Sequence, residues 1–225
     1  MLVLDRVTDW SVLRRVRPYR SEFGWRRGDC IDRFYIEGFL ATYESCIRGC
    51  VAEIGGNEYT KQFGGTRVEH SDILDINEQN SQRTMTIDLA QTANAPENIF
   101  DCIICPQTLY LIYDYTAAVR SLRKMLKPCG VLLVTLPGIA QRTPDTMLGG
   151  AGADWWRFTG RSAQRTFAGI FGAENVAVET YGNVLTATAF LHGLVQKELT
   201  GDELEYHDPD YEVIIGVKAT KPTAR

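Results

Sequence analysis

The stretch Cys50-Val51-Ala52-Glu53-Ile54-Gly55-Gly56-Asn57-Glu58-Tyr59 decides how this chain folds. A short apolar run ends in an acid, and two glycines follow at once. This pattern predicts a buried strand that turns sharply, because glycine adopts positive φ and lets a ligand approach the backbone closely. A helix that opens there would present unpaired N–H groups. Ligands of open parallel sheets bind at this carboxyl edge. A tight turn without a ligand is the alternative, and the glycine pair alone does not decide between them.

The composition is that of one globular domain. The 225 residues are 44% hydrophobic and 23% charged, with a net charge of −4. These values exclude a disordered chain and argue against a general nucleic-acid binder, which would carry a basic face. We expect a single domain, with an N-terminal arm and helix or lid over 1–45 and the core over 46–225. No apolar run reaches the length of a membrane span, and no signal-peptide pattern opens the chain, so a cytoplasmic protein is expected.

Two of the six cysteines, Cys102 and Cys105, form a CxxC motif that could indicate metal or redox chemistry. They lie in an apolar segment that predicts a buried strand. Side chains three residues apart on a strand point to opposite faces. We therefore expect both to be small buried hydrophobes, and without a second CxxC or a histidine cluster no zinc site is predicted.

Strand and helix patterns alternate through the rest of the chain, which predicts a doubly wound, Rossmann-like α/β domain. The predicted strands cover residues 51–54, 71–76, 84–89, 99–105, 131–136, 175–180 and 211–219. The predicted helices cover residues 32–40, 116–126, 162–171 and 185–199.

Acidic residues end the second and third predicted strands. Asp75 follows Gly55 by 20 residues, the spacing at which a carboxylate reaches a ribose hydroxyl in nucleotide-binding α/β folds. Asp88 ends the third strand. Asn77 lies close enough to Asp75 to compete for the ribose.

Taken in order, these pieces resemble a class I S-adenosylmethionine-dependent methyltransferase over roughly residues 30–220. Val51-Ala52-Glu53-Ile54-Gly55 resembles the first motif of that family, and 100–109 resembles its fourth-strand motif. Leu126-Lys127-Pro128-Cys129-Gly130-Val131-Leu132 is similar to the family's LKPGG turn, with Cys129 in place of a glycine. The resemblance implies a seven-stranded, mostly parallel sheet whose last strand is antiparallel.

The resemblance also implies S-adenosylmethionine as cofactor and S-adenosylhomocysteine as product. The glycine loop would hold the methionine part, Asp75 the ribose, and Asp88 with Leu89 the adenine. The implied cofactor residues are Glu53, Gly55, Gly56, Asn57, Asp75, Asn77, Asp88, Leu89, Gln107 and Thr108.

The first motif departs from the family pattern of three alternate glycines. Only Gly55 of that set is present, and Asn57 and Tyr59 stand at the other two positions. Tyr59 is large and could narrow the pocket. A non-catalytic methyltransferase-like partner therefore stays open as an alternative. An NAD-dependent oxidoreductase is a further alternative, and the missing GxGxxG counts against it.

Three segments, 28–37, 154–159 and 207–211, are similar to segments of methyltransferases from bacterial glycan and sugar-tailoring pathways. This narrower likeness implies O-methylation of a sugar or oligosaccharide hydroxyl. Methyl transfer is an in-line displacement that needs positioning, and a hydroxyl acceptor must also lose its proton to a base.

The catalytic candidates are His192, His207 and Tyr110. The structural alternative is a helix contact for His192, a turn for His207 and core packing for Tyr110. Trp155 and Trp156 could form a sugar platform or cover the sheet. Asp154 or Asp208 could hold a divalent cation, although no spacing demands a metal. A homodimer is left open. The predicted substrate-binding residues are Arg33, Tyr35, Asp154, Trp155, Trp156 and Arg157.

Overall fold

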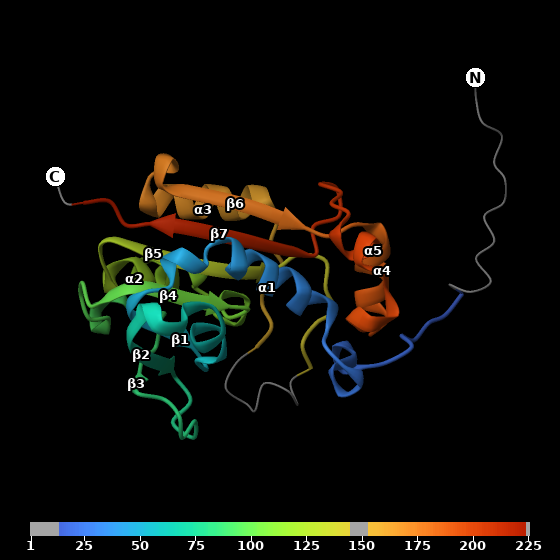
Figure 1. Cartoon of the computed structure of the whole chain (residues 1–225), viewed down its shortest axis with the longest axis horizontal. Helices are drawn as coiled ribbons and strands as arrows, with labels where there is room; N and C mark the ends of the chain where they lie inside the picture. The colour runs from blue at the N-terminus through green and yellow to red at the C-terminus, as the bar shows by residue number, and fades with distance from the viewer. Residues whose placement is uncertain (1–13, 145–152, 224–225) are drawn as a thin grey trace.

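The computed structural model describes residues 14–144 and 153–223, which form a twisted sheet with helices on both faces (Figure 1). The strand order is β3-β2-β1-β4-β5-β7-β6. Strand β7 runs antiparallel to both β5 and β6, and the other strand pairs are parallel. The predicted seven-stranded sheet with an antiparallel last strand is confirmed. The strands are β1 (Gly49–Ile54), β2 (Val68–Asp75), β3 (Met85–Thr86), β4 (Phe100–Pro106), β5 (Leu126–Pro137), β6 (Val176–Tyr181) and β7 (Ile214–Thr220).

Five α-helices cover the sheet in the described parts of the chain. Helices α2 and α3 pack on one face through a core that includes Leu122 and Phe167. Helices α1 and α4 pack on the other face through Phe39 and Phe190. The helices are α1 (Ile31–Thr42), α2 (Tyr115–Met125), α3 (Gly160–Phe171), α4 (Val184–Leu191) and α5 (Gly201–Glu205).

The central strands are buried on both faces, as their continuous apolar runs predict. Cys102 and Cys105 of β4 are both fully buried, and each belongs to the core on a different face of the sheet. Burial raises the pKa of both thiols, that of Cys105 to about 12. Within residues 14–144 and 153–223, no group of three or more metal-ligating side chains comes together. The interpretation of the CxxC as buried packing is confirmed.

Three of the elements whose boundaries differ from the prediction show a clear physical reason for the difference. Strand β3 is only two residues long, because Ile87 and Leu89 turn inward and become buried. The predicted helix over 185–199 ends at Leu191, since Gly193 follows with a φ of +69°. Strand β5 begins directly after α2, and Cys129 within it has a φ of +64°. That conformation explains why the resembling family has a glycine at this position.

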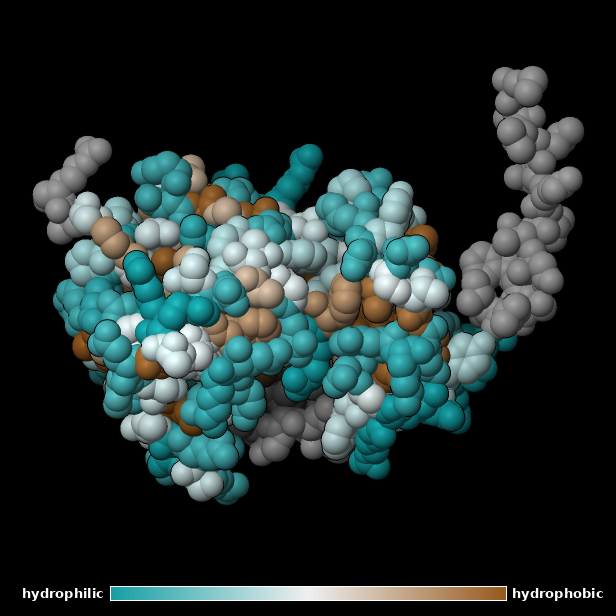
Figure 2. Space-filling model, in the orientation of Figure 1, coloured by the Kyte–Doolittle hydropathy of each residue, from teal (hydrophilic) through white to brown (hydrophobic). Residues whose placement is uncertain are grey.

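Polar residues cover most of the face shown in Figure 2, and hydrophobic residues are exposed between α1 and α4. Helix α4 contributes Val184, Leu185 and Leu191 to the exposed set. No helix in the described ranges is long and apolar enough to cross a bilayer.

Candidate active site

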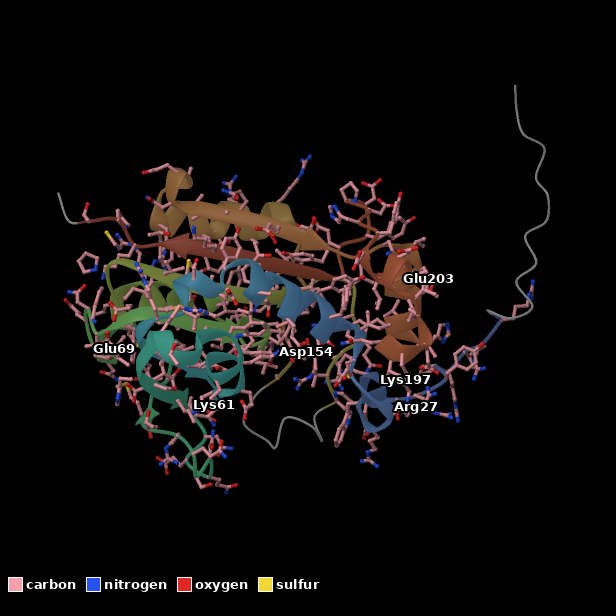
Figure 3. All side chains as sticks on the ribbon, in the orientation of Figure 1. Arg27, Lys61, Glu69, Asp154, Lys197 and Glu203 are labelled. Carbon is pink, nitrogen blue, oxygen red and sulfur yellow. The ribbon has the colours of Figure 1, made fainter. Side chains whose placement is uncertain are left out.

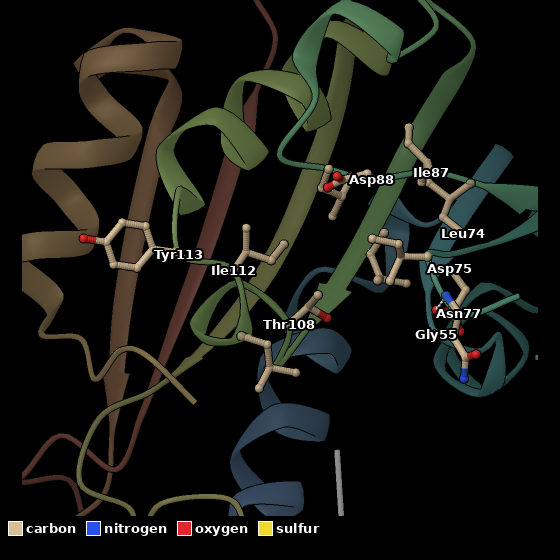
Figure 4. Close-up of a pocket in the computed structure, with 13 residues that line it drawn as sticks. Gly55, Leu74, Asp75, Asn77, Ile87, Asp88, Thr108, Ile112 and Tyr113 are labelled. Carbon is tan, nitrogen blue, oxygen red and sulfur yellow. Dashed lines mark hydrogen bonds between the residues drawn. The ribbon is translucent and has the colours of Figure 1, made fainter. Parts of the chain in front are cut away.

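A cavity opens at the carboxyl ends of β1, β2 and β4, where the winding of the sheet reverses (Figure 4). Its volume is about 500 Å³. Ligands of doubly wound sheets bind at this switch point. Six of the ten predicted cofactor residues line the cavity, namely Gly55, Asp75, Asn77, Asp88, Leu89 and Thr108.

Gly55 forms the sharp turn at the end of β1. Its φ is +83°, and its N–H donates to the Leu74 carbonyl across a 2.9 Å hydrogen bond. A Cβ built on Gly55 would meet no protein atom within 4 Å. The glycine therefore leaves open space at the cavity wall, which is the feature that a closely approaching ligand needs.

Glu53 supports this turn from behind. It is 2% exposed and is not among the cavity-lining residues. Its carboxylate accepts from the Thr60 N–H at 2.7 Å, from the Thr60 hydroxyl at 2.8 Å and from the Tyr59 N–H at 3.3 Å. Burial raises the pKa of Glu53, and these hydrogen bonds oppose the rise. Glu53 therefore stabilises the conformation of the loop after β1.

The two departures from the glycine pattern leave the cavity open. The ring of Tyr59 stacks on Phe63, with centroids 6.3 Å apart, and packs against the core on the α1 side. Tyr59 therefore does not narrow the cavity. Gly56 and Asn57 lie outside its lining, and the Asn57 N–H donates to Glu58 Oε2 at 3.1 Å.

Asp75 lies at the end of β2 and faces the glycine turn. Its Oδ1 accepts from the Asn77 N–H at 2.8 Å, and its Oδ2 accepts from Asn80 Nδ2 at 2.7 Å. Asn80 Nδ2 also donates to the Gly55 carbonyl at 3.1 Å. Asn80 thus connects the first two motifs. The sequence alone does not mark Asn80 as a site residue, because nothing in its loop distinguishes it from neighbouring polar residues.

Asn77 and Asp88 both use side-chain oxygens to shape their own loops. Asn77 Oδ1 accepts from the Gln79 N–H at 3.0 Å. Asp88 accepts from the Ala90 N–H and from Gln91 Nε2, each at 2.9 Å. The turn at Asp88 carries the main chain inward, so that Leu89 is 5% exposed and forms part of the cavity wall.

A second, smaller cavity of about 150 Å³ lies across the end of β4. Gln107 lines this cavity and the next residue, Thr108, lines the larger one. Gln107 has a φ of +43°, and its N–H donates to the Thr135 carbonyl at 3.0 Å. The two cavities therefore adjoin at the end of β4. The smaller is lined by Phe23, Asp32, Gln107, Tyr110, Pro137, Ala140, Gln141, Thr143, Arg157, Phe190 and Ile214.

Asp154 fixes the polar wall of the smaller cavity. Its carboxylate accepts from Arg157 Nη2 at 2.8 Å and from the Thr143 N–H at 2.7 Å. The Asp154 side chain is only 3% exposed. It is labelled near the middle of the view in Figure 3. Burial opposes ionisation of Asp154, but the hydrogen bonds from Arg157 and Thr143 outweigh it and hold its pKa below the ordinary value. Asp154 acts as a clamp that orients Arg157.

Tyr110 also lines the smaller cavity. Its hydroxyl lies 3.1 Å from the Thr143 hydroxyl, and the Arg157 guanidinium lies 5.6 Å from the centre of its ring. Burial raises the pKa of Tyr110, so its hydroxyl stays protonated near neutral pH. This geometry suits an orienting group better than a base.

The two predicted tryptophans have different surroundings. Trp156 donates its ring N–H to the Ile112 and Tyr113 carbonyls, at 3.1 and 3.2 Å, and packs against the core. Trp155 is 52% exposed, and its ring centroid lies 5.1 Å from that of Tyr113. Tyr113 itself lines the larger cavity. A platform role is therefore open to Trp155, whereas Trp156 covers the sheet.

The remaining predicted residues line neither cavity. His207 Nε2 lies 3.1 Å from the Thr180 hydroxyl, in a separate apolar groove that Tyr35 also lines. Tyr35 is buried and donates its hydroxyl to the Leu204 carbonyl at 3.0 Å. His192 ends α4 with its ring 5.2 Å from that of Tyr19. Arg33 is exposed on α1.

The sequence matches the family model described as "Methyltransferase domain" over residues 57–134. The match covers about a third of the chain, from the loop after β1 to strand β5. S-adenosylmethionine is the cofactor of methyltransferases that have this fold, and the open space at Gly55 and the carboxylate of Asp75 fit it. When bound, this cofactor supplies a methyl group activated by its bond to a positively charged sulfur.

Solved structures with the same fold have different activities. An S-adenosylmethionine-dependent methyltransferase from Mesorhizobium loti has a TM-score of 0.55 and 14% identity, covering 85% of this chain and 98% of its own. The N-methyltransferase NodS from Bradyrhizobium japonicum, in complex with S-adenosyl-L-homocysteine, has a TM-score of 0.51 and 11% identity. The match covers 92% of this chain and 95% of NodS. The [4+2]-cyclase SpnF has a TM-score of 0.52 and 14% identity, and the match covers 93% of this chain and 89% of SpnF. No curated protein matched by sequence.

Proposed function

We propose that the protein transfers a methyl group from S-adenosylmethionine to a hydroxyl of a sugar or oligosaccharide. The observation that carries this proposal is the exposed Trp155–Tyr113 pair at the rim of the cofactor cavity. Aromatic rings offer apolar faces on which the C–H groups of a sugar pack. Because Tyr113 belongs to the cavity wall, an acceptor resting on this pair would lie beside the cofactor.

The smaller cavity supports the same proposal by its chemistry. Its polar groups are mostly uncharged amides and hydroxyls, from Gln107, Gln141, Tyr110 and Thr143. Groups of this kind donate to and accept from hydroxyls. Arg157, the one cation among the described lining residues, is already paired with Asp154. The lining therefore favours a neutral, hydroxyl-rich acceptor over a strongly anionic one.

The chain positions the reactants and excludes water around them. Positioning contributes much of the rate in an in-line displacement, because the bound groups have already lost their freedom of motion. Tyr110 and Thr143 can orient an acceptor oxygen, and the clamp of Asp154 on Arg157 holds their wall in place. Removal of the hydroxyl proton needs a base in addition.

The proposal is tested by methyl transfer from radiolabelled S-adenosylmethionine to a panel of mono- and oligosaccharides. A parallel panel of small primary amines serves as the competing acceptor class. We expect label on sugars and none on amines. Label on the amines alone, or no label on either panel, would overturn the sugar assignment.

A non-catalytic partner is the second candidate. The altered glycine positions, Asn57 and Tyr59, are the observation that keeps it open. A scaffold of this kind would not bind S-adenosylhomocysteine in a calorimetric titration, whereas the proposed enzyme would. The orientation of Tyr59 away from the cavity supports the enzyme.

A further inference from the structure

Asp32 lies in the first turn of α1 and lines the smaller cavity together with Gln107 and Tyr110. One of its oxygens, Oδ1, accepts from the Arg33 N–H at 2.9 Å. Within the described ranges no side chain forms an ion pair with it. Asp154, the other acid beside this cavity, has its oxygens occupied by Arg157 and Thr143. Asp32 is therefore the carboxylate that keeps an acceptor oxygen for a ligand.

The surroundings of Asp32 also suit proton transfer. Burial raises its pKa to about 6, against the opposing effect of the Arg33 guanidinium. A carboxylate with this pKa is ionised at neutral pH and is more basic than an ordinary aspartate, which favours it as a general base.

The titratable groups that face Asp32 come from three elements. Cys30 and Arg33 belong to its own helix and cap, and burial raises the pKa of Cys30 to about 11. Tyr59 follows β1 and Tyr110 follows β4, and burial raises the pKa of both, that of Tyr59 to about 12. Cys30 and the two tyrosines are therefore uncharged near neutral pH.

Arg157 lies beyond Tyr110 and is paired with Asp154. Asp32 thus has a different charge environment from the clamp, although both acids adjoin one cavity. A single carboxylate facing mostly neutral groups can gain or lose a proton without breaking an ion pair.

Gln141 is an independent sign that this cavity suits a polar ligand. It lines the cavity, and its Nε2 is buried without a hydrogen-bond partner in the described parts of the chain. A buried donor left unpaired costs free energy. An acceptor oxygen in the cavity would pair with this amide.

We propose that Asp32 is the general base of the reaction and that Gln141 holds the acceptor beside it. This inference rests on the proposed function. The acceptor O–H bond breaks and its proton passes to the free oxygen of Asp32. The electron pair of that bond forms the new C–O bond to the methyl carbon. The carbon–sulfur bond breaks and sulfur keeps its electron pair, which leaves neutral S-adenosylhomocysteine.

The test compares Asp32→Asn with the wild type. The asparagine oxygen can still accept from the Arg33 N–H, so the start of α1 is kept. Asp29→Asn is the matched control, because Asp29 is exposed just before α1 and outside the cavity. We expect kcat for a labelled sugar to fall roughly 10²-fold or more in Asp32→Asn, with unchanged affinity for S-adenosylhomocysteine. Asp29→Asn should match the wild type in both.

The pH profile gives a second readout. In the wild type, kcat/KM, which reports ionisation of the free enzyme, should rise with pH and level off above about 6, the pKa of Asp32. The residual rate of Asp32→Asn should lack this rise. A variant that keeps the wild-type kcat and profile would overturn the role of Asp32 and leave the proposed function standing. A wild type that methylates no hydroxyl acceptor would overturn the proposed function, and the role of Asp32 with it.

A third readout needs no acceptor. Carbon NMR of aspartate-labelled free protein should show one carboxyl that titrates with a midpoint of about 6 and is missing from Asp32→Asn. A midpoint near the ordinary aspartate value of about 4 would overturn the proposal even if the sugar activity is present.

Discussion

The two cavities beside the end of β4 are built in different ways. The larger takes all of its lining from between Ile54 and Tyr113, mostly at strand ends and in the loops that follow them. The smaller draws on the N-terminal segment, the start of α1, the segment after β5 and the end of α4. A cofactor site of the first kind can be predicted from the order of its motifs. An acceptor site of the second kind depends on how distant segments pack, so substitutions in the two cavities should have separable effects on cofactor and acceptor binding.

The largest effect should come from Gly55→Val. A valine at a φ of +83° is strained and would fill the open space in the cavity wall. We expect S-adenosylhomocysteine affinity, measured by calorimetry, to fall below detection. Gly65→Val is the matched control, since Gly65 also has a positive φ and open space but lies outside the cavity. It should lose similar stability and keep its affinity. Normal affinity in Gly55→Val would show that the cofactor lies elsewhere.

Asp75→Ala should have the next largest effect. It removes a carboxylate suited to a ribose diol, and charge-assisted hydrogen bonds of this kind contribute about 1–3 kcal/mol. Calorimetry should show cofactor affinity weakened by that amount. Asn77→Ala should weaken it less, because Asn77 Oδ1 already accepts from Gln79. The reverse ranking would assign the ribose to Asn77.

Trp155→Ala tests the acceptor side. Removal of one exposed aromatic face should weaken sugar binding by about 1 kcal/mol, the contribution of roughly 40 Å² of buried apolar surface. We expect a raised KM for the sugar and an unchanged affinity for the cofactor. Trp25→Ala is the control, because Trp25 is 53% exposed, close to the 52% of Trp155. Equal KM values for the sugar in the two variants would show that Trp155 does not serve as a sugar-binding platform.

The smallest effects should come from His192→Ala and His207→Ala. Loss of a general base costs roughly 10²–10⁴-fold in rate, but neither histidine lines the two cavities. Both variants should therefore keep most of their turnover in the sugar assay. A large loss of kcat in either variant would show that the substituted histidine belongs to the acceptor site.

The fold was predictable because its strands are marked locally. Apolar runs ended by an acid, a glycine or a proline locate β1, β2 and β4, and the segment around Cys129 locates the start of β5. The short β3 and the end of α4 were harder, since the inward turn at Leu89 and the contact of Gly193 with Arg20 depend on tertiary packing.

The acceptor side was less predictable for the same physical reason. Of the nine residues predicted there, only Tyr110 and Arg157 line the smaller cavity. Trp156 and Tyr35 have the expected residue types, but their polar atoms are used in contacts with the backbone. Asp32 carries no local signal beyond its place at the start of a helix, and only tertiary packing brings the start of α1 to the cavity.

The central claim is that the cavity at the ends of β1, β2 and β4 binds S-adenosylmethionine. Calorimetric titration of the wild-type protein with S-adenosylhomocysteine, beside an identical titration with NAD, tests it most directly. We predict saturable binding of one S-adenosylhomocysteine per chain and no heat from NAD. Binding of NAD alone, or of neither ligand, would contradict the account.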